Sequence, residues 1–123
     1  MRIGGSIDRI DRTESGGIEV IDYKTGSPAS QKDVDSNLQL TIYALVVRDT
    51  LRLGTPEKVT LYFTESSDRR STVRTDEQLD LARQELLDRV RPIRAGEFTA
   101  NPGVACKWCD YTAICAERSL KKW

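Results

Sequence analysis

The chain has 123 residues, carries 19 Lys and Arg against 19 Asp and Glu, and contains three cysteines and no histidine. Its length fits one small domain with a single core, and the lack of histidine excludes a His general base, a Ser-His-Asp triad and any His-containing zinc site within the chain. Neither a run of 18 apolar residues nor a secretory signal is present, so we expect a cytoplasmic chain that does not span a membrane.

The segment GSIDRIDRTESGGIEVIDYKTG predicts a β-hairpin. Its first strand carries Ile3, Ile7 and Asp8, TESGG supplies Gly and Ser for a turn, and the second strand is Ile18–Lys24, with alternating apolar and polar residues. An odd-length loop centred on residue 15 places Asp8 directly opposite Asp22, with their Cβ atoms about 4.5–5.5 Å apart.

Asp22 and Lys24 share one face of the second strand, because residues two apart point the same way. Two neighbouring carboxylates repel each other, and Mg²⁺ or Mn²⁺ relieves this repulsion because these cations prefer oxygen ligands. A lysine beside the metal can hold a phosphate or orient a water, which suits phosphodiester hydrolysis. The alternative is a surface hairpin with ordinary acid–lysine pairs, although Val20, Ile21 and Tyr23 give Asp22 apolar neighbours.

The motifs GSIDRID, IEVIDYKTG and QLTIYAL, in this order, resemble the RecB-like branch of the PD-(D/E)XK nuclease superfamily. The resemblance implies five catalytic residues: Asp8, Asp22, Lys24, Gln39 and Tyr43. It also implies that Mg²⁺ (or Mn²⁺) is held by Asp8, Asp22 and the backbone carbonyl of Tyr23. Without the resemblance, Gln39 and Tyr43 equally fit an ordinary polar pair at the edge of a packed helix.

A helix is predicted from Gln31 to about Leu51, after the turn-rich loop TGSPAS. Ser30 is the expected N-cap, with Asp33 three residues later. The helix ends at LGTP, where Gly and Pro interrupt it. Its expected apolar face consists of Val34, Leu38, Ile42 and Leu45.

The next elements are a strand over Lys58–Glu65, rich in β-branched and aromatic residues, a polar turn over Ser66–Arg70, and a short returning strand over Ser71–Thr75. Arginines in this region are the best candidates for contacts to DNA phosphates. They fit solvated charges at a sheet edge equally well. The candidates are Arg69, Arg70 and Arg74.

A capping box, Thr75 with Gln78, predicts the start of a further helix that runs to about Ile93. A regular apolar stripe follows the helix period, so we interpret this helix as structural. The stripe consists of Leu79, Ala82, Leu86, Val90 and Ile93.

Cys106, Cys109 and Cys115 form the pattern C-x2-C-x5-C, which in a cytoplasmic chain favours metal binding over disulfides. A 4Fe–4S cluster needs four thiolates. The resemblance to AddB-type and CRISPR-associated nucleases implies such a cluster in the intact protein, with the fourth cysteine far upstream. The alternatives are structural cysteines buried beside Trp108 and Tyr111, a zinc site completed by Asp110, and a tail that holds no metal.

These elements predict an α/β fold of restriction-endonuclease type, with a mixed central sheet flanked by helices and a cysteine-containing tail. We expect a nuclease core over residues 1–98 and the tail over residues 99–123. Only four residues precede GSID, whereas the family has a helix before this strand, so we expect an N-terminally truncated part of a larger protein. Without such a helix, apolar surface that it would cover is left exposed, so we expect the chain to dimerise through that surface.

The expected function is that of a Mg²⁺-dependent deoxyribonuclease (exonuclease) domain of a RecB-like helicase–nuclease. It would act in DNA double-strand break repair and recombination, with DNA and a helicase domain or subunit as partners. A non-catalytic nuclease-fold module that binds DNA or serves as a scaffold is the alternative, and a small metal-binding interaction domain is a third. The presence of Asp8, Asp22 and Lys24 together favours catalysis.

Overall fold

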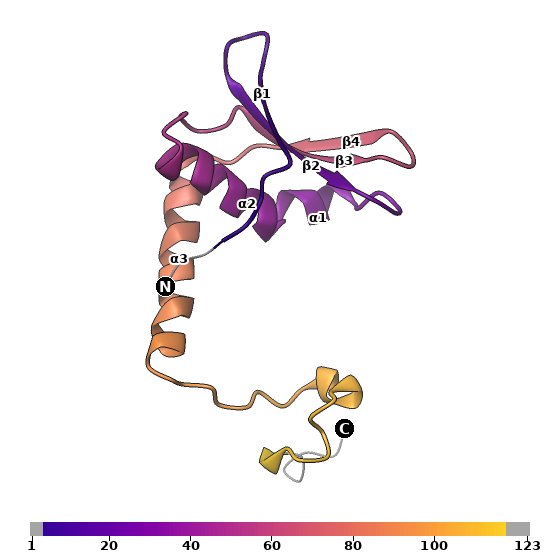
Figure 1. Ribbon diagram of the computed structural model, residues 1–123, viewed down its shortest axis with the longest axis vertical. Coiled ribbons are helices and arrows are strands. Elements are labelled where there is room, and N and C mark those ends of the chain that lie inside the picture. Colours follow the sequence, from indigo (N-terminus) through magenta and orange to yellow (C-terminus); the bar gives the residue numbers. More distant parts are fainter. Residues whose placement is uncertain (1–3, 118–123) are drawn as a thin grey trace. The chain divides into compact units, whose positions relative to one another are not determined.

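A four-stranded mixed sheet dominates the computed structural model, which describes residues 4–117 (Figure 1). Its order is β1-β2-β3-β4, with β2 and β3 parallel and both outer pairs antiparallel. The strands are β1 Arg9–Arg12, β2 Ile18–Lys24, β3 Lys58–Phe63 and β4 Asp68–Thr72. The predicted α/β class with a mixed sheet and flanking helices is thereby confirmed.

The chain divides into two compact units, the first ending at Asp88 and the second beginning at Arg89. The first unit contains the sheet and its core, and the second contains the short 3-10 helix η2, Val104–Trp108. Within residues 4–117, no helix combines the length and the apolar character needed to cross a bilayer. The division predicted between residues 98 and 99 stays a prediction.

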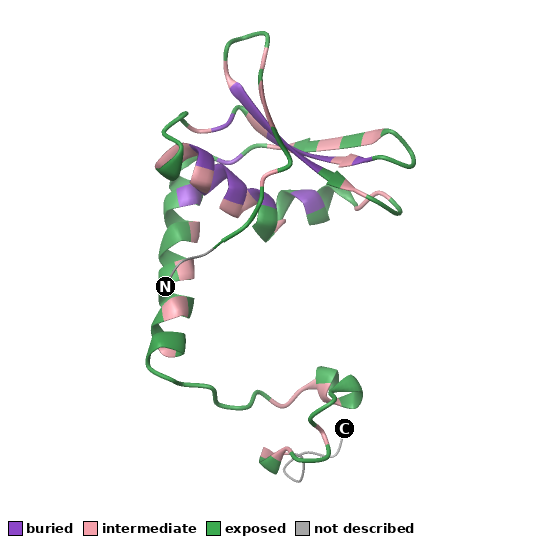
Figure 2. Cartoon of the chain, in the orientation of Figure 1, coloured by how far each residue is buried: buried purple, intermediate pink, exposed green. Residues whose placement is uncertain are grey.

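β2 is a central strand, and its residues Ile18–Asp22 are buried (Figure 2). Alternation along β2 and β3 sends Val20 and Val59 to one face, where α1 and α2 complete the hydrophobic core. Asp22 lies on this same core face, because it is two residues beyond Val20. The site described below is therefore built where β2 leaves the core.

The loop between β1 and β2 sets the register that the sequence predicted. Thr13 N–H donates to Gly17 O at 3.0 Å, and Gly16 has φ 87°, a left-handed conformation that favours glycine. The pairing Arg9↔Ile21 is centred on residue 15 as expected. The first strand begins later than predicted, at Arg9. Of the residues assigned to its start, Ile7 and Asp8 precede β1, and Ile3 lies outside the described residues.

The predicted single helix over Gln31–Leu51 is wrong, because the chain forms three successive pieces. They are α1 Gln31–Asp35, α2 Leu38–Leu45 and a π-helical turn, η1, Val46–Thr50. Asn37 caps α2 by accepting from Leu40 N–H at 3.0 Å, and such side chains compete with the helix for backbone groups. The expected cap of α1 is confirmed, since Ser30 Oγ accepts from Asp33 N–H at 3.2 Å.

The buried face of this region also differs from the prediction. Of the predicted face, Val34 and Leu45 are buried as expected, whereas Leu38 is 55% exposed and Ile42 is only partly buried. The other buried residues are Leu40, Tyr43, Ala44 and Val47. Residues 38–47 are apolar nearly throughout, so periodicity alone does not select one face. The sheet against which α2 packs makes that selection.

The strands β3 and β4 follow the predicted hairpin with a shifted turn. The turn occupies residues 64–67 and Ser67 has φ 55°, so β4 starts at Asp68. Arg69 and Arg70 therefore lie within a strand, where the prediction placed a turn. Polar residues resemble a turn in sequence, but here they pair with β3, Tyr62 opposite Arg69.

Helix α3, Asp76–Arg94, begins at the predicted capping box, which is confirmed. Gln78 N–H donates to Thr75 Oγ1 at 3.2 Å, and Thr75 N–H donates to Gln78 Oε1 at 2.9 Å. Leu79 is fully buried, and the next two residues of the predicted stripe pack on the same core. These contacts pack the first turns of α3 against the hydrophobic core.

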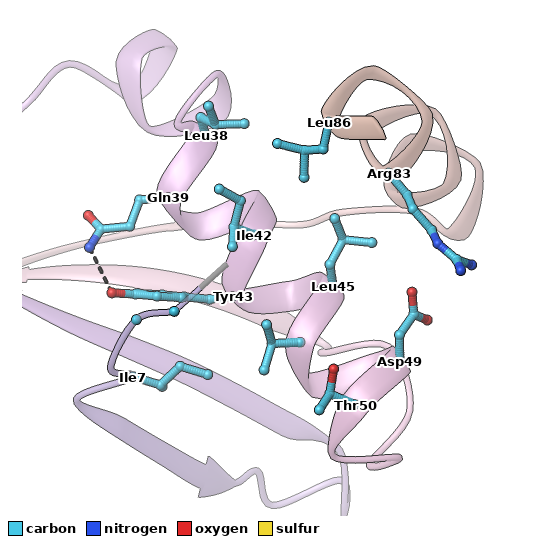
Figure 3. A pocket seen from close by; sticks show the side chains of 13 residues that line it. Ile7, Leu38, Gln39, Ile42, Tyr43, Leu45, Asp49, Thr50, Arg83 and Leu86 are labelled. Atoms are coloured by element: carbon cyan, nitrogen blue, oxygen red, sulfur yellow. Dashed lines mark hydrogen bonds between the residues drawn. The ribbon is translucent and has the colours of Figure 1, made fainter. Parts of the chain in front are cut away.

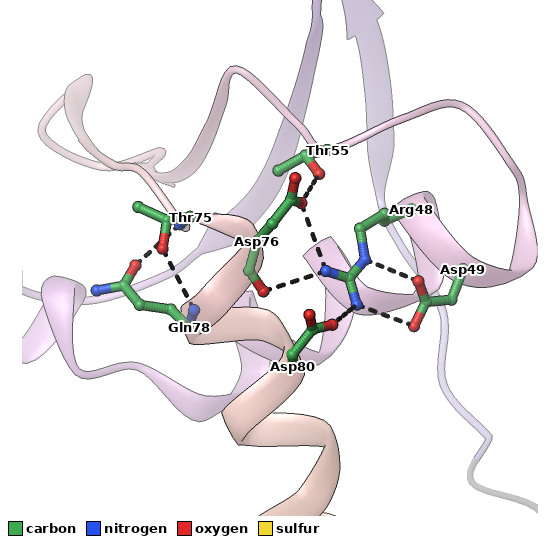
Figure 4. A network of polar contacts seen from close by, with 7 residues as sticks. All are labelled: Arg48, Asp49, Thr55, Thr75, Asp76, Gln78 and Asp80. Atoms are coloured by element: carbon green, nitrogen blue, oxygen red, sulfur yellow. Dashed lines mark hydrogen bonds and ion pairs between the residues drawn. The ribbon is translucent and has the colours of Figure 1, made fainter.

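Arg48 connects η1 to the first turn of α3 (Figure 4). Its guanidinium donates to Asp49 at 2.7 Å and to Asp80 at 2.7 Å, and it lies 3.4 Å from Asp76, which also accepts from Thr55. Arg48 holds the pKa of Asp49 below its ordinary value, and Thr55 and then Arg48 do the same for Asp76. Because these two pKa values are depressed, the contribution of the network to the stability of the fold decreases at low pH.

We expect Arg48→Met to lower the melting temperature at about pH 6 and to have a much smaller effect at about pH 3. A carboxylate with a depressed pKa stabilises the fold above its ordinary pKa, here 3.8, and loses that contribution as the pH falls through the folded value. Thermal unfolding followed by circular dichroism measures the melting temperature at each pH. Arg89→Met, on an exposed part of α3, is the matched control, and an equal effect of Arg48→Met at both pH values would contradict this coupling.

Candidate active site

Asp22 is a buried acid at the end of β2, with 3% of its surface exposed. Lys24 Nζ lies 2.7 Å from Asp22 Oδ2, which is ion-pair distance. The approach is not aligned as a hydrogen bond, so within the described residues this oxygen has no directed donor. A buried carboxylate oxygen normally has such a partner.

Asp8 lies beside Asp22 on the neighbouring chain segment. The pairing ends at Arg9↔Ile21, and one further step in the same register would bring Asp8 opposite Asp22, which stays a prediction. Asp8 Oδ2 accepts from Tyr23 N–H at 2.9 Å. This bond orients Asp8 at the start of β1, and a carboxylate retains further lone pairs for a cation.

A polar chain runs from β2 to α2 and holds the lysine. Lys24 Nζ donates to Gln39 Oε1 at 2.8 Å, and Gln39 Nε2 donates to the Tyr43 hydroxyl at 2.7 Å (Figure 3). Tyr43 is 9% exposed and belongs to the core, so it gives the chain a rigid base. The structure thus connects Lys24 to Tyr43 through Gln39, and a catalytic role for these two residues stays a prediction.

The residues at this site fit a hard divalent cation. The buried Asp22 has a carboxylate oxygen that lacks an aligned donor, Asp8 accepts from the amide of the next residue, Tyr23, and Mg²⁺ is commonly bound by one or two carboxylates with water and phosphate completing its coordination. In the part of the chain that the structure describes, no three His, Cys, Asp or Glu side chains form a ready-made metal group. Asp8 and Asp22 would therefore share the ion with oxygens from outside the side-chain set, such as the Tyr23 carbonyl.

A groove of about 840 Å³ adjoins this site, because Gln39 and Tyr43 also line it (Figure 3). The rest of its wall is mainly apolar, and Asp49 and Arg83 lie at the end away from Gln39. Sequence reasoning missed this groove because its leucines and isoleucines were assigned to a packed helix face. Its apolar lining includes Ile7, Leu38, Ile42, Leu45, Val46 and Leu86.

The three predicted DNA-contacting arginines have different surroundings. Arg69 pairs with Glu19 at 3.1 Å, and Arg70 pairs with Asp68 at 3.0 Å, both with partly exposed side chains on β4. Phosphate contacts by these two stay predictions. The third, Arg74, is described next.

Arg74 is buried, with 7% of its surface exposed, and its donors are directed at the protein. It donates to Thr41 Oγ1 at 2.9 Å and to Val34 O at 3.3 Å, beside the break between α1 and α2. Burial lowers the pKa of this guanidinium. This placement corrects the prediction of a phosphate contact, because Arg74 instead links β4 to both helices.

The cysteines lie in the second unit and are free thiols. Cys106 Sγ accepts from Gly103 N–H at 3.4 Å, while Trp108 and Tyr111 are 76% and 71% exposed. The alternative in which cysteines are buried beside these two aromatic rings is therefore wrong. As placed within residues 4–117, the three thiols do not form a metal-binding group.

The comparison with protein families agrees with this geometry. A family model for the PD-(D/E)XK nuclease superfamily matches residues 1–116, which is nearly the whole chain. The search of curated proteins found no match to the chain. The matched range contains the sheet, the acid pair with its lysine, and the cysteine segment. The chain therefore belongs to the PD-(D/E)XK nuclease superfamily.

Proposed function

We propose that the chain is the metal-dependent deoxyribonuclease domain of a RecB-like exonuclease or helicase–nuclease. Membership of a nuclease superfamily supports phosphodiester hydrolysis as its chemistry. The observation that carries the proposal is the buried Asp22, whose Oδ2 lacks an aligned donor although Lys24 and Asp8 lie beside it. Burial of a carboxylate that has an ion-pair partner but no aligned donor at that oxygen costs stability, which is typical of a functional site.

The side chains have distinct proposed roles. Asp8 and Asp22 hold Mg²⁺ or Mn²⁺, and the ion when bound polarises the phosphate and makes its water a stronger nucleophile. Lys24 orients the attacking water and stabilises the negative charge that develops on the phosphate. Gln39 and Tyr43 are positioning residues, because Gln39 accepts from Lys24 at 2.8 Å and is itself held by a 2.7 Å hydrogen bond to the Tyr43 hydroxyl.

The more specific parts of the proposal rest on the sequence motifs that resemble RecB-like nucleases. They are a cytoplasmic role in double-strand break repair and recombination, a helicase partner, and a 4Fe–4S cluster in the intact protein with Cys106, Cys109 and Cys115 as three ligands. Iron and sulfide analysis after anaerobic purification tests the cluster. A monomer in light scattering at high concentration would count against the predicted dimer.

End-labelled linear DNA, single-stranded and double-stranded, tests the nuclease activity directly. We expect cleavage with Mg²⁺ or Mn²⁺ and none with a chelator. Labels at the 5′ and 3′ ends give the polarity of digestion. DNA binding without cleavage under every metal condition would instead favour the non-catalytic DNA-binding module.

Gln39→Leu is expected to lower kcat by about 10- to 100-fold, because a misplaced catalytic group costs on the order of 10² in rate. The substitution removes the oxygen that accepts from Lys24 Nζ. Mn²⁺ affinity should change little, since both acids remain. Gln84→Leu on α3 is the matched control and should leave both quantities unchanged. Loss of Mn²⁺ binding in Gln39→Leu would contradict a role through the lysine.

A further inference from the structure

We propose that the sheet face opposite the acid pair is a stacking platform for the bases of single-stranded DNA, which rests on the proposed nuclease function. Two tyrosines, Tyr23 and Tyr62, lie side by side there between two arginines, Arg9 and Arg69. We call these four residues the tyrosine–arginine row. No part of the catalytic set described above explains them.

Strand alternation places the row on this face. Tyr23 lies between Asp22 and Lys24 in the chain, so its ring points to the other side of β2. The register aligns Tyr23 with Tyr62 and Tyr62 with Arg69 across three strands. Helices α1 and α2 pack on the opposite face, with the core residues. The row is therefore outside the hydrophobic core.

Specific contacts hold the row in order. The two tyrosine rings meet edge to face, with centroids 5.6 Å apart and planes at 63°. Arg69 lies over the Tyr62 ring, its Cζ 5.6 Å from the centroid, and Arg9 Nη1 donates to the Tyr23 hydroxyl at 3.3 Å. Ordered aromatic side chains lose little conformational freedom when a ligand stacks on them.

The exposed charge of this face is positive. The side chains of Arg9 and Arg69 are 53% and 52% exposed, whereas their acidic partners Asp11 and Glu19 are 32% and 11% exposed. Lys58, also paired with Glu19, is 41% exposed. A guanidinium has five N–H donors, so an ion pair to one carboxylate orients it and leaves donors for a phosphate.

This combination fits single-stranded nucleic acid. Aromatic rings stack on any base, and arginines contact the backbone, but a duplex keeps its bases inside the stack. The platform is also continuous with the proposed active site, because Asp8 directly precedes Arg9, the first residue of the edge strand β1. A strand that passes this edge moves from the acid pair to the tyrosine–arginine row.

Fluorescence anisotropy with a labelled oligothymidine of about 12 nucleotides tests the platform, in chelator so that cleavage plays no part. We expect Tyr62→Leu and Tyr23→Leu each to weaken binding by about tenfold, since each ring stacks on a base. Tyr62→Phe keeps the ring and should bind like the unmodified chain. Tyr111→Leu, an exposed tyrosine of the second unit, is the control and should also have no effect.

An oligonucleotide of the same length with abasic sites separates stacking from charge. On this probe the two leucine variants should bind like the unmodified chain, while Arg69→Gln should weaken binding to both probes. The platform is overturned if folded leucine variants, verified by circular dichroism, bind oligothymidine as tightly as the unmodified chain. It is also overturned if they lose affinity equally for both probes.

Photocrosslinking gives a second readout. An oligonucleotide that carries 5-iodouracil should crosslink to peptides containing Tyr23 or Tyr62, and crosslinks confined to Trp108 or Tyr111 would overturn the platform. Failure of the platform leaves metal-dependent cleavage by the acid pair untouched. Conversely, tyrosine-dependent binding in a chain that never cleaves DNA would keep the platform and reject the nuclease function.

Discussion

Asp22→Asn is expected to reduce Mg²⁺-dependent cleavage by about a thousandfold or more while the chain stays folded. A bound metal ion contributes several kcal/mol to the stabilisation of the transition state, and each 1.36 kcal/mol corresponds to tenfold in rate. Asp22 is the buried member of the acid pair, and its Oδ2 lies beside Lys24 without an aligned donor. Asparagine keeps the shape of the side chain but removes the charge that would hold the ion.

The same substitution should change stability little in the absence of metal. The cost of burying the Asp22 carboxylate and the gain from its ion pair with Lys24 are of similar size, and the Lys24 side chain is 35% exposed, so loss of both terms should nearly cancel. Thermal unfolding and Mn²⁺ titration calorimetry on the same samples test this. We expect an almost unchanged melting temperature together with loss of saturable Mn²⁺ binding.

Asp11→Asn is the matched control for this experiment. Asp11 lies on the same hairpin, but it points to the other face of the sheet and pairs with Arg9 at 2.7 Å. Its substitution should leave metal binding intact. Cleavage by Asp22→Asn at the rate of the unmodified chain would show that the acid pair is not the catalytic centre.

Leu40→Ala is expected to destabilise the first unit by about 2–5 kcal/mol, a large part of the stability of a small domain. Leu40 is fully buried between α2 and the sheet, next to Gln39 in the chain. Truncation leaves a cavity beneath the helix that carries the polar chain to Lys24. Urea unfolding followed by circular dichroism measures the loss as a lower midpoint at constant slope.

Leu38→Ala tests the same helix from its other side. Leu38 is 55% exposed, so the substitution should change stability by no more than about 0.5 kcal/mol. The sequence placed Leu38 on the buried face, and the structure places Leu40 there instead. If the two variants lost equal stability, the packing of α2 described here would be wrong.

Local signals in the sequence were enough to predict several elements. The loop between β1 and β2 has Gly16 at φ 87°, and the register centred on residue 15 that an odd-length loop predicted is the one observed for β1 and β2. Ser30 and Thr75 begin their helices as predicted, because a cap bonds to backbone groups only two or three residues away. Such interactions are complete within a short stretch of chain.

The sequence by itself thus determined the hairpin, the starts of α1 and α3, and the β3 strand. Tertiary structure decided which face of residues 38–47 is buried, because nearly every residue there is apolar and only the packed sheet distinguishes them. It also decided that Arg74 is internal and that Gln39 reaches Lys24. These outcomes depend on partners 15 to 40 residues away in the chain, whose positions no local pattern encodes.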